Sequence, residues 1–392
     1  MLKGNMVIGQ SGGPTAVINQ SLVGAILAAR EAVGIEKILG ARHGLKGIMN
    51  EDFIDLNSQT LKQLEAVAQT PAAGLGSVRL KPGKTECERV FEVFKKHNVR
   101  YFFYIGGNDS AETAHIIAEM AQQENYALCT MHIPKTIDND LKVTDHCPGF
   151  ASAARFVALA FMGDDRDNAA LSGVKINVVM GRHAGFLTAA SALARQAPGD
   201  GPHLIYLPER VFDIARFQQD VRDAVATHGR CVIAVSEGIA DAEGNPIAST
   251  GERDSHGNIQ LSGTGALGDT LAAHVKAAFS GEAIRVRADT FGYLQRSFPA
   301  TVSEIDRREA REVGAFAVKH AVNTGKSAAI AIRRIANAPY QSEYFDTALS
   351  TVAREATEMD DQYINDAGND VTEAWLAYVR PLVGDLPEIG RL

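Results

Sequence analysis

Two polar loops of this chain each follow an apolar run that is typical of a buried strand. The motif GGNDS occupies residues 106–110, and the motif PKTIDND occupies residues 134–140. Ligands of an open parallel α/β sheet bind just beyond the carboxyl ends of its strands, so both loops are positioned for substrate binding. Their residue types predict phosphoryl transfer to a polyol and not hydride transfer.

The second loop combines a cation, a hydroxyl group and a carboxylate, from Lys135, Thr136 and Asp138. Such a carboxylate can take a proton from a sugar hydroxyl while the lysine stabilises the phosphoryl group in transit. The alternative is an ordinary turn, since Asp-Asn-Asp sequences are common in turns. The position of the loop after a strand, with a lysine and a threonine in front, favours the catalytic interpretation.

The first loop offers glycine amides at the start of a helix, where a phosphate group can bind. The alternative is a helix N-terminus capped by Asp109 or Ser110. A carboxylate that points into an anion site is unusual, so Asp109 requires an explanation. A third glycine-rich motif, SGGP at residues 11–14, is neither GxGxxG nor a P-loop. It is compatible with a phosphate-binding turn or with a simple turn between a strand and a helix.

Two charged residues follow later apolar runs. Arg182 comes after a run that ends at residue 180, and Glu237 comes directly after the run at residues 231–235. A carboxylate at a strand end can accept hydrogen bonds from sugar hydroxyl groups. Arg182 is compatible with a ligand contact or with an arginine that covers the start of a helix.

Three arginines could supply the local positive charge that an anionic ligand needs in a chain of net charge −8: Arg285, Arg287 and Arg296. Arginine suits phosphate because its planar fork makes two parallel hydrogen bonds. The alternative is a solvated arginine-rich surface. Residues 291–294 look partly buried, which weakens that alternative.

Apolar runs alternate with helical patterns along most of the 392 residues, which predicts an α/β fold with parallel sheets. A chain of this length is expected to form more than one hydrophobic core. We therefore expect two Rossmann-like lobes with mainly parallel sheets and the active site in the cleft between them. The predicted lobes are residues 1–149 with 295–345 and residues 150–294 with 346–392.

Two segments depart from the alternating pattern. Residues 239–268 are rich in Gly, Asp, Asn and Ser, and we interpret them as an inserted excursion, either a hairpin or a mobile flap. The tail after Pro339 is mixed and polar, and we expect a helical appendix there.

Composition excludes several classes of protein. A net charge of −8 and an isoelectric point near 5.8 argue against a nucleic-acid partner. The four cysteines form no CxxC motif, so neither zinc nor a disulfide framework is indicated. A strand-like run at residues 6–9 leaves no room for a signal peptide, and no uncharged apolar run reaches the roughly 18 residues of a membrane helix. We expect a cytoplasmic protein without a membrane partner.

A nicotinamide-dependent oxidoreductase is disfavoured as well. A Rossmann dehydrogenase carries an acidic residue at the end of its second strand, and the corresponding run here, residues 38–42, ends in Arg42. The GxGxxG fingerprint is also missing.

Taken in their order along residues 6–335, the motifs resemble those of the 6-phosphofructokinase family. The resemblance implies that Asp138 removes the proton from the 1-hydroxyl of fructose 6-phosphate, while Thr136 and Arg182 support the phosphoryl group. It further implies a homodimer in which Arg287 reaches the neighbouring subunit. The substrate-binding residues implied are Thr136, Ile137, Asp138, Met180, Gly181, Arg182, Glu237, Arg287, Tyr293, Leu294, Gln295 and Arg296.

The same resemblance implies pyrophosphate as the phosphoryl donor. Members of the family that use ATP carry glycine at the positions of Asp109 and Lys135, and Asp109 looks like a residue that fills the space of the ATP α-phosphate. A carboxylate about 4 Å from a phosphate charge, at an effective dielectric near 20, costs roughly 4 kcal/mol, on the order of a thousandfold in affinity. Lys135 looks like the compensating cation. The donor set implied is Gly12, Arg79, Gly107, Asp109 and Lys135.

The family resemblance also implies Mg²⁺ as a cofactor and a reversible step of glycolysis or gluconeogenesis. Asn108 lies where many relatives carry an acidic metal contact, so we expect the metal to be bound through water or mainly by pyrophosphate. Gly173 lies where bacterial ATP-using relatives carry an arginine of the adjacent subunit, and whether Lys175 replaces it stays open. The first lobe would bind the donor and Mg²⁺, and the second the sugar phosphate. The alternatives are an ATP-dependent or dual-donor kinase and, more distantly, a non-catalytic sugar-phosphate sensor.

Overall fold

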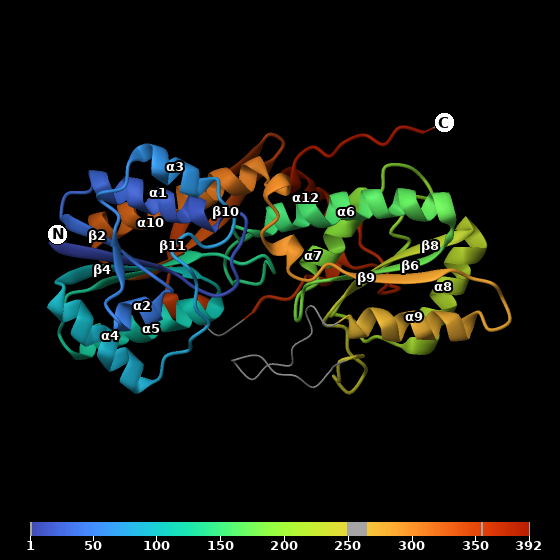
Figure 1. Cartoon of the computed structure of the whole chain (residues 1–392), viewed down its shortest axis with the longest axis horizontal. Helices are drawn as coiled ribbons and strands as arrows, with labels where there is room; N and C mark the ends of the chain where they lie inside the picture. Colours follow the sequence, from blue (N-terminus) through green and yellow to red (C-terminus); the bar gives the residue numbers. More distant parts are fainter. Residues whose placement is uncertain (1, 249–264, 354–355, 392) are drawn as a thin grey trace. The chain divides into compact units, whose positions relative to one another are not determined.

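The computed structural model describes residues 2–248, 265–353 and 356–391 (Figure 1). The chain divides into two compact units. Unit 1 consists of Met1–Phe150 with Arg296–Thr357, and unit 2 consists of Ala151–Gln295 with Glu358–Leu392. Each unit has its own sheet and its own core.

Unit 1 contains a seven-stranded sheet in the order β11-β10-β5-β4-β1-β2-β3. The five central strands are parallel, and β3 and β11 pair antiparallel at the two edges. Its strands are β1 (Gly4–Gln10), β2 (Ile35–Ala41), β3 (Phe53–Asp55), β4 (Val99–Gly106), β5 (Cys129–Pro134), β10 (Ala328–Asn337) and β11 (Tyr340–Thr347). Its helices are α1 (Ile18–Glu31), α2 (Leu45–Met49), α3 (Leu61–Ala68), α4 (Lys84–Lys96), α5 (Asn108–Gln123), α10 (Glu304–Thr324) and α11 (Leu349–Val352).

Helices cover both faces of this sheet, which is why β4 is apolar at every position except Arg100, near its start. Tyr101 and Phe103 face one core cluster, which includes residues of α1 and α10, and Phe102 and Tyr104 face another, which includes residues of α2, α4 and α5. Helices α1 and α10 touch closely, because a Cβ atom on Gly24 would lie only 2.0 Å from the carbonyl oxygen of Arg311.

Unit 2 contains a four-stranded, fully parallel sheet in the order β7-β8-β6-β9. Its strands are β6 (Gly173–Val179), β7 (Leu204–Tyr206), β8 (Arg230–Ser236) and β9 (Val286–Thr290). Its helices are α6 (Phe150–Leu171), α7 (Phe186–Ala189), α8 (Ile214–His228), α9 (Ala266–Ala278) and α12 (Glu373–Val383), with short 3₁₀ turns at Ala190–Ala194, Leu294–Arg296 and Asp361–Tyr363. The α/β class with mostly parallel sheets is therefore confirmed.

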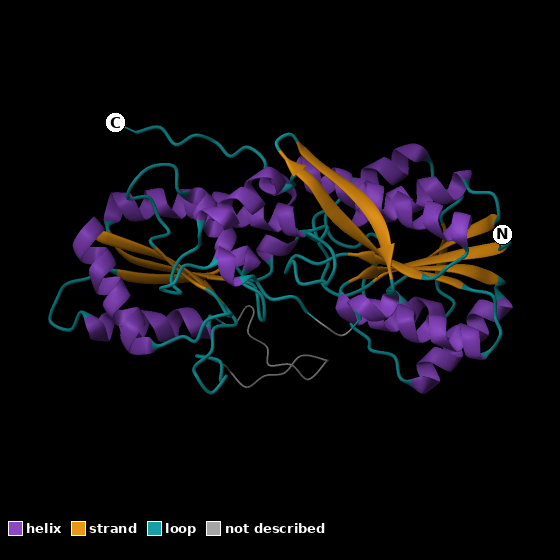
Figure 2. Ribbon diagram, turned by 180° about the vertical axis from the view of Figure 1, so that it is seen from behind, coloured by secondary structure: helices purple, strands orange, loops and turns teal. Residues whose placement is uncertain are grey.

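The helical appendix predicted after Pro339 is wrong for its first part. Strand β11 follows a turn at Ala338 and Pro339 and forms a long antiparallel hairpin with β10, drawn in orange in Figure 2. Its side chains alternate along much of the strand between exposed and partly buried, as expected of an edge strand with one covered face. The later part of the tail does contain a helix, α12.

The segment predicted as an excursion is described only in part. Ala240 and Pro246 form an antiparallel bridge around a tight turn, and α9 begins at Ala266. Residues 249–264 lie outside the described residues. The described part of the chain contains no helix that is long and apolar enough to cross a membrane.

Candidate functional site

Three loops of unit 1 converge at the carboxyl ends of adjacent parallel strands. They are the loops that follow β1, β4 and β5, which are neighbours in the sheet. The amide of Ser11 donates to the carbonyl of Ile105 at 2.9 Å, and the amide of Lys135 donates to the carbonyl of Gly106 at 3.0 Å. The structure thus brings together the three motifs that the sequence singled out separately.

Lys135 is the central cation of this group. Its side chain is 3% exposed, and its Nζ donates to the carbonyl oxygen of Gly13 at 2.7 Å. Burial and the positive charges of Arg296 and Arg79 lower the pKa of Lys135 to about 8, although Asp138 and Asp140 act in the opposite direction. The charged form of a buried ammonium group with a lowered pKa is strongly stabilised when an anion binds beside it.

Two glycines lie where the backbone approaches these cations. Gly12 has a φ of +74°, and a Cβ atom there would lie 3.2 Å from Lys135 Nζ. A Cβ atom on Gly13 would lie 3.0 Å from Nη1 of Arg296. The turn after β1 therefore passes close to two cationic side chains, and its lack of side chains leaves room beside them.

The GGNDS loop forms the start of α5. Gly107 is the N-cap residue, so neither Asp109 nor Ser110 takes the capping position considered above. Asp109 lies exposed in the first turn, and the Oδ1 atom of Asn108 accepts a hydrogen bond from the Asp109 amide at 2.9 Å. A helix N-terminus attracts anions, and here the carboxylate of Asp109 already contributes a negative charge at that position.

The catalytic candidates occupy the loop after β5. Thr136 and Asp138 are half-buried, and Ile137 is buried between them. The hydroxyl oxygen of Thr136 accepts a hydrogen bond from the Asp138 amide at 3.0 Å, which ties the two residues into one turn. Asn139 follows with a φ of +59°, a conformation that asparagine tolerates.

Unit 2 brings together a second set of predicted residues. The amide of Glu237 donates to the carbonyl of Val179 at 2.9 Å, and a Cβ atom on Gly238 would lie 1.9 Å from the carbonyl oxygen of Arg182. Met180, Gly181 and Arg182 therefore lie directly beside Glu237 at the ends of the paired strands β6 and β8.

The arginine-bearing segment of unit 2 is more exposed than the sequence predicted. Tyr293 is 47% exposed and Leu294 is 66% exposed, so the expectation that residues 291–294 are partly buried is wrong for these two. Arg287 is exposed on the edge strand β9. Gln295 is buried, and its Oε1 accepts a hydrogen bond from the Met180 amide at 3.4 Å.

Lys175, whose role was left open, forms ion pairs within its own unit. Its Nζ lies 3.3 Å from a carboxylate oxygen of Asp164 and also pairs with Asp289. Although burial opposes the charged form, these carboxylates raise the pKa of Lys175.

Sequence reasoning missed two carboxylates that hold the predicted loops. Asp306 of α10 accepts a hydrogen bond from the Gly149 amide at 2.8 Å, and Glu209 accepts one from the Gly185 amide at 2.8 Å. Burial raises the pKa of Glu209. Each carboxylate is more than 20 residues from its donor, so no local pattern could reveal these bonds.

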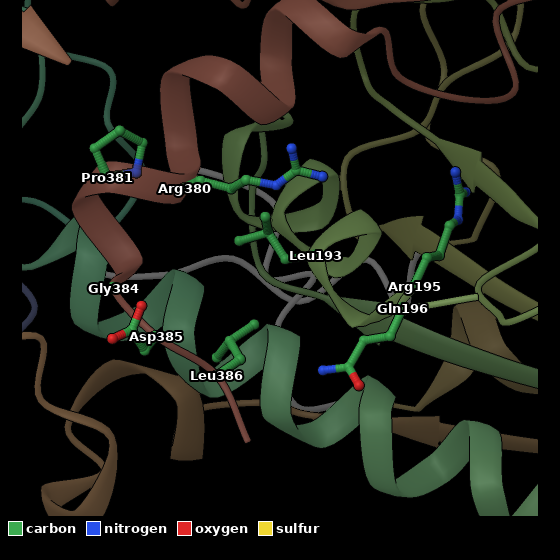
Figure 3. Close-up of a pocket in the computed structure, with 8 residues that line it drawn as sticks. All are labelled: Leu193, Arg195, Gln196, Arg380, Pro381, Gly384, Asp385 and Leu386. Carbon is green, nitrogen blue, oxygen red and sulfur yellow. The ribbon is translucent and has the colours of Figure 1, made fainter. Parts of the chain in front are cut away.

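Unit 2 contains a cavity of about 460 Å³, whose lining residues are labelled in Figure 3. It is bordered by the end of α12 and by residues 193–196. Arg195 is already paired with Asp370 through two hydrogen bonds of 2.8 and 3.0 Å, and Gln196 donates to the carbonyl of Pro387 at 2.7 Å. None of the predicted site residues borders this cavity, and we assign it no role in the chemistry.

Known proteins resemble the chain over its whole length. The phosphofructokinase family profile matches residues 5–321. A curated relative from Rhodospirillum rubrum, named pyrophosphate--fructose 6-phosphate 1-phosphotransferase, is 54% identical, and the match covers 100% of this chain and 97% of the relative. A relative of the same name from Xanthomonas campestris is 40% identical over 99% of this chain and 93% of its own length.

A solved structure supports the same relationship. The crystal structure of a pyrophosphate-dependent phosphofructokinase from Nitrosospira multiformis superposes with a TM-score of 0.88 at 34% sequence identity, covering 99% of this chain and 94% of that one. The order of motifs, the two units and these matches agree. The chain belongs to the phosphofructokinase family.

Proposed function

We propose that this chain is a phosphotransferase that moves a phosphoryl group from pyrophosphate to the 1-hydroxyl of fructose 6-phosphate, forming fructose 1,6-bisphosphate and phosphate in a reversible step of glycolysis or gluconeogenesis. The observation that carries the proposal is the buried Lys135, whose ammonium group lies against the Gly12-Gly13 turn, next to a helix start that carries Asp109. The relatives with the highest identities reported above carry this activity in their names.

Asp109 and Lys135 act together in the choice of donor. The carboxylate of Asp109 in the first turn of α5 repels an ATP α-phosphate, while Lys135 provides the positive charge for a compact diphosphate. Arg79, Gly12 and Gly107 complete the donor set. An ATP-dependent or dual-donor kinase is the second candidate, and it would require a nucleotide to tolerate Asp109.

Asp138 acts as the general base that takes the proton of the sugar 1-hydroxyl as the phosphoryl group arrives. Thr136, Lys135 and Arg182 stabilise the charge on the phosphoryl oxygens, so that the catalysis rests on positioning and neutralisation. The sugar phosphate is bound by Met180, Gly181, Glu237 and the segment from Arg287 to Arg296. Unit 1 thus supplies the donor set and the base, and unit 2 most of the sugar set.

The donor groups of this site are compatible with Mg²⁺ bound mainly through pyrophosphate. Among the described residues, no three His, Cys, Asp or Glu side chains gather into a metal site. Mg²⁺ commonly keeps several waters and binds through one or two protein oxygens and the substrate phosphates. Asn108, with Asp109 beside it, is the protein contact we propose, and the metal would neutralise diphosphate charge. A cytoplasmic homodimer stays a prediction.

The direct test is a coupled assay with fructose 6-phosphate and Mg²⁺, supplied with pyrophosphate or with ATP. We expect turnover with pyrophosphate alone. Turnover with ATP alone would contradict the choice of donor, and turnover with both would favour a dual-donor enzyme. No turnover with either donor would favour a non-catalytic sensor.

The role of Asp138 is tested by Asp138→Asn, which keeps the size of the side chain and removes the base. General bases contribute typically about 10²–10⁴-fold, so we expect kcat to fall by that range while the KM values stay within about threefold. A kcat near the wild-type value would remove Asp138 as the base. Thermal melting of the variant serves as the control for folding.

A further inference from the structure

A buried histidine with two carboxylate partners lies behind the catalytic loop of unit 1. His146 is 2% exposed, its Nδ1 lies 2.7 Å from Asp145 Oδ1, and its Nε2 lies 2.6 Å from Glu309 Oε2. Glu309 belongs to α10 and is 1% exposed. Burial opposes the charged imidazole, but the hydrogen bonds to these carboxylates outweigh it and raise the pKa of His146 to about 9. Because both ring nitrogens face carboxylate oxygens, this geometry favours the imidazolium, which carries an N–H on each nitrogen.

The hairpin of β10 and β11 encloses this group. The Tyr340 hydroxyl donates to Glu309 Oε1 at 2.7 Å, and the Ser342 hydroxyl donates to the same oxygen at 2.5 Å. Arg334 donates to Asp145 Oδ1 through Nε at 3.1 Å and Nη2 at 2.9 Å. Although burial alone would raise them, the hydrogen bonds to His146 lower the pKa values of Asp145 and Glu309. Three elements of unit 1 thus meet at one charged centre.

The residues that follow His146 hold the catalytic loop by its backbone. The amide of Cys147 donates to Asn139 Oδ1 at 2.9 Å, one residue after Asp138. The amide of Thr136 donates to the carbonyl of Pro148 at 3.2 Å, and the hydroxyl of Thr136 in turn accepts from the Asp138 amide. A shift of His146 along its segment would therefore displace both ends of the turn that carries Asp138.

The segment before His146 is held in a strained conformation. Val143 has a φ of +74°, which is a true outlier for a β-branched residue. Thr144 accepts a hydrogen bond from the Ile332 amide at 2.9 Å, and the Asp145 amide donates to the Ile332 carbonyl at 2.8 Å. Backbone strain of this kind persists only where the surrounding contacts are strong enough to hold it. The hydrogen bonds to Ile332 therefore indicate that this segment is held rigidly.

We propose that His146 and Glu309 are positioning residues for the proposed reaction: their ion pair fixes residues 141–149 to α10 and thereby sets Asp138 in its reactive position. The proposal rests on the proposed function, since it names Asp138 as the base. A neutral imidazole has one N–H, so loss of the proton would leave a ring nitrogen facing a carboxylate oxygen at less than 3 Å. A displacement of about 1 Å of a reacting group can cost roughly 10²-fold in rate.

Several titratable groups face His146 and enter the pH dependence. Asp145, Glu309 on α10 and Tyr340 on β11 contact the ring directly, and Arg334 on β10 reaches it through Asp145. Cys147 is the next residue in the chain, and Asp306 lies one turn before Glu309 on α10. Lys135 also titrates in the alkaline range, with a pKa of about 8. Loss of the Lys135 charge would raise KM for pyrophosphate and also lower kcat, whereas loss of the His146 proton would lower kcat alone. Bound pyrophosphate is an anion and keeps Lys135 protonated. At saturating pyrophosphate, the pH dependence of kcat therefore reports on His146 and not on Lys135.

The experiment measures kcat against pH at saturating pyrophosphate for the wild type and for Glu309→Gln. In the wild type, kcat should fall with a midpoint near pH 9. Glu309→Gln keeps a hydrogen-bonding side chain but removes the charge, so its kcat should fall at least one pH unit lower. The ratio of variant to wild-type kcat should rise at least about threefold from pH 8.5 to pH 6.5, with both KM values within twofold at pH 6.5. Tyr340→Phe removes a hydrogen bond to the same carboxylate without changing its charge, and its ratio should stay constant within twofold.

A constant ratio for Glu309→Gln, or a wild-type kcat that stays level to pH 10, overturns the proposal. The second criterion needs no variant and holds even if Glu309→Gln does not fold. The hydrogen-exchange rates of the amides in residues 135–150 report on the same contacts and do not depend on enzyme activity. These rates should be at least tenfold faster in Glu309→Gln than in Tyr340→Phe. If the wild type has no turnover with pyrophosphate, the proposed function fails, while unchanged exchange would overturn the positioning role alone.

Discussion

Lys135 in unit 1 and Arg287 in unit 2 are both cations that we assign to phosphate groups, but the structure holds them in different ways. Lys135 is 3% exposed and bonded to the carbonyl oxygen of Gly13, in a turn whose glycine permits the approach. Arg287 is exposed on an edge strand, and its guanidinium donates at 2.9 Å to the carbonyl of its own neighbour, Val286. The donor cation is therefore preorganised by the core of its unit. We expect a ligand or a second subunit to order the Arg287 side chain when it binds the sugar phosphate.

Of the variants that test this contrast, Lys135→Met should have the largest effect, since it keeps most of the length of the side chain and removes the charge. Charge–charge attraction of roughly 4 kcal/mol at 4 Å implies an increase of at least about 100-fold in KM for pyrophosphate. Because Lys135 carries its charge below a pKa of about 8, the wild-type KM should rise above pH 8, and this rise should vanish in the variant. Initial-rate kinetics from pH 6.5 to 9 measure both.

The same substitution at an exposed lysine is the control for Lys135→Met. Lys84 has an 89% exposed side chain at the start of α4, and Lys84→Met should leave the KM for pyrophosphate within twofold. Burying an ammonium group costs free energy, so Lys135→Met should also melt no lower than the wild type. If Lys135→Met leaves the KM for pyrophosphate unchanged, Lys135 is not the preorganised donor cation, and the contrast with the exposed Arg287 fails.

A smaller effect is expected from Arg287→Gln. A charge-assisted hydrogen bond is worth about 1.5–3 kcal/mol, so KM for fructose 6-phosphate should rise roughly 10- to 100-fold. Since Arg287 is exposed, the free energy of unfolding should change by less than about 0.5 kcal/mol. Arg285→Gln, two residues earlier on the same exposed segment, should change this KM less than twofold. Equal effects of the two variants would mean that Arg287 acts only through general positive charge.

The smallest effect is expected from Gly12→Ala. Comparison with Gly325→Ala distinguishes backbone strain at residue 12 from its contact with Lys135. Gly12 and Gly325 have similar φ values of +74° and +67°, but no described atom lies within 4 Å of a Cβ on Gly325. Gly12→Ala and Gly325→Ala should each cost about 1–2 kcal/mol of folding stability, measured by denaturant unfolding. Only Gly12→Ala should raise KM for pyrophosphate, by about threefold. An equal KM for pyrophosphate in both variants would show that a side chain at residue 12 does not disturb Lys135.

The strands that carry the site were predictable because they are buried on both faces. Mostly apolar runs in β1, β4 and β5 need no long-range information, and the loops after them carry their polar residues in a few consecutive positions. Strand β11 was misread as a helical tail because its alternation of polar and aromatic residues is weak at an edge that faces solvent. The exposure of Tyr293 and Leu294 likewise depends on packing that no local pattern records.

Contacts across long separations were not predictable at all. Lys135 and Gly13 are 122 residues apart, and His146 and Glu309 are 163 residues apart. Both pairs depend on which strands and helices become neighbours in the sheet order. The loops that carry the proposed donor set could therefore be located from the chain, whereas the groups that hold these loops in place had to be found in the structure.

The central claim is that Asp109 and Lys135 choose the phosphoryl donor. The most direct test is the coupled assay on the double variant Asp109→Gly with Lys135→Gly, supplied with fructose 6-phosphate, Mg²⁺ and either ATP or pyrophosphate. We predict measurable turnover with millimolar ATP in the double variant, none in the wild type, and a loss of at least 100-fold in kcat/KM for pyrophosphate. A folded double variant that neither binds nor uses ATP at millimolar concentration, or that retains wild-type use of pyrophosphate, would contradict the account.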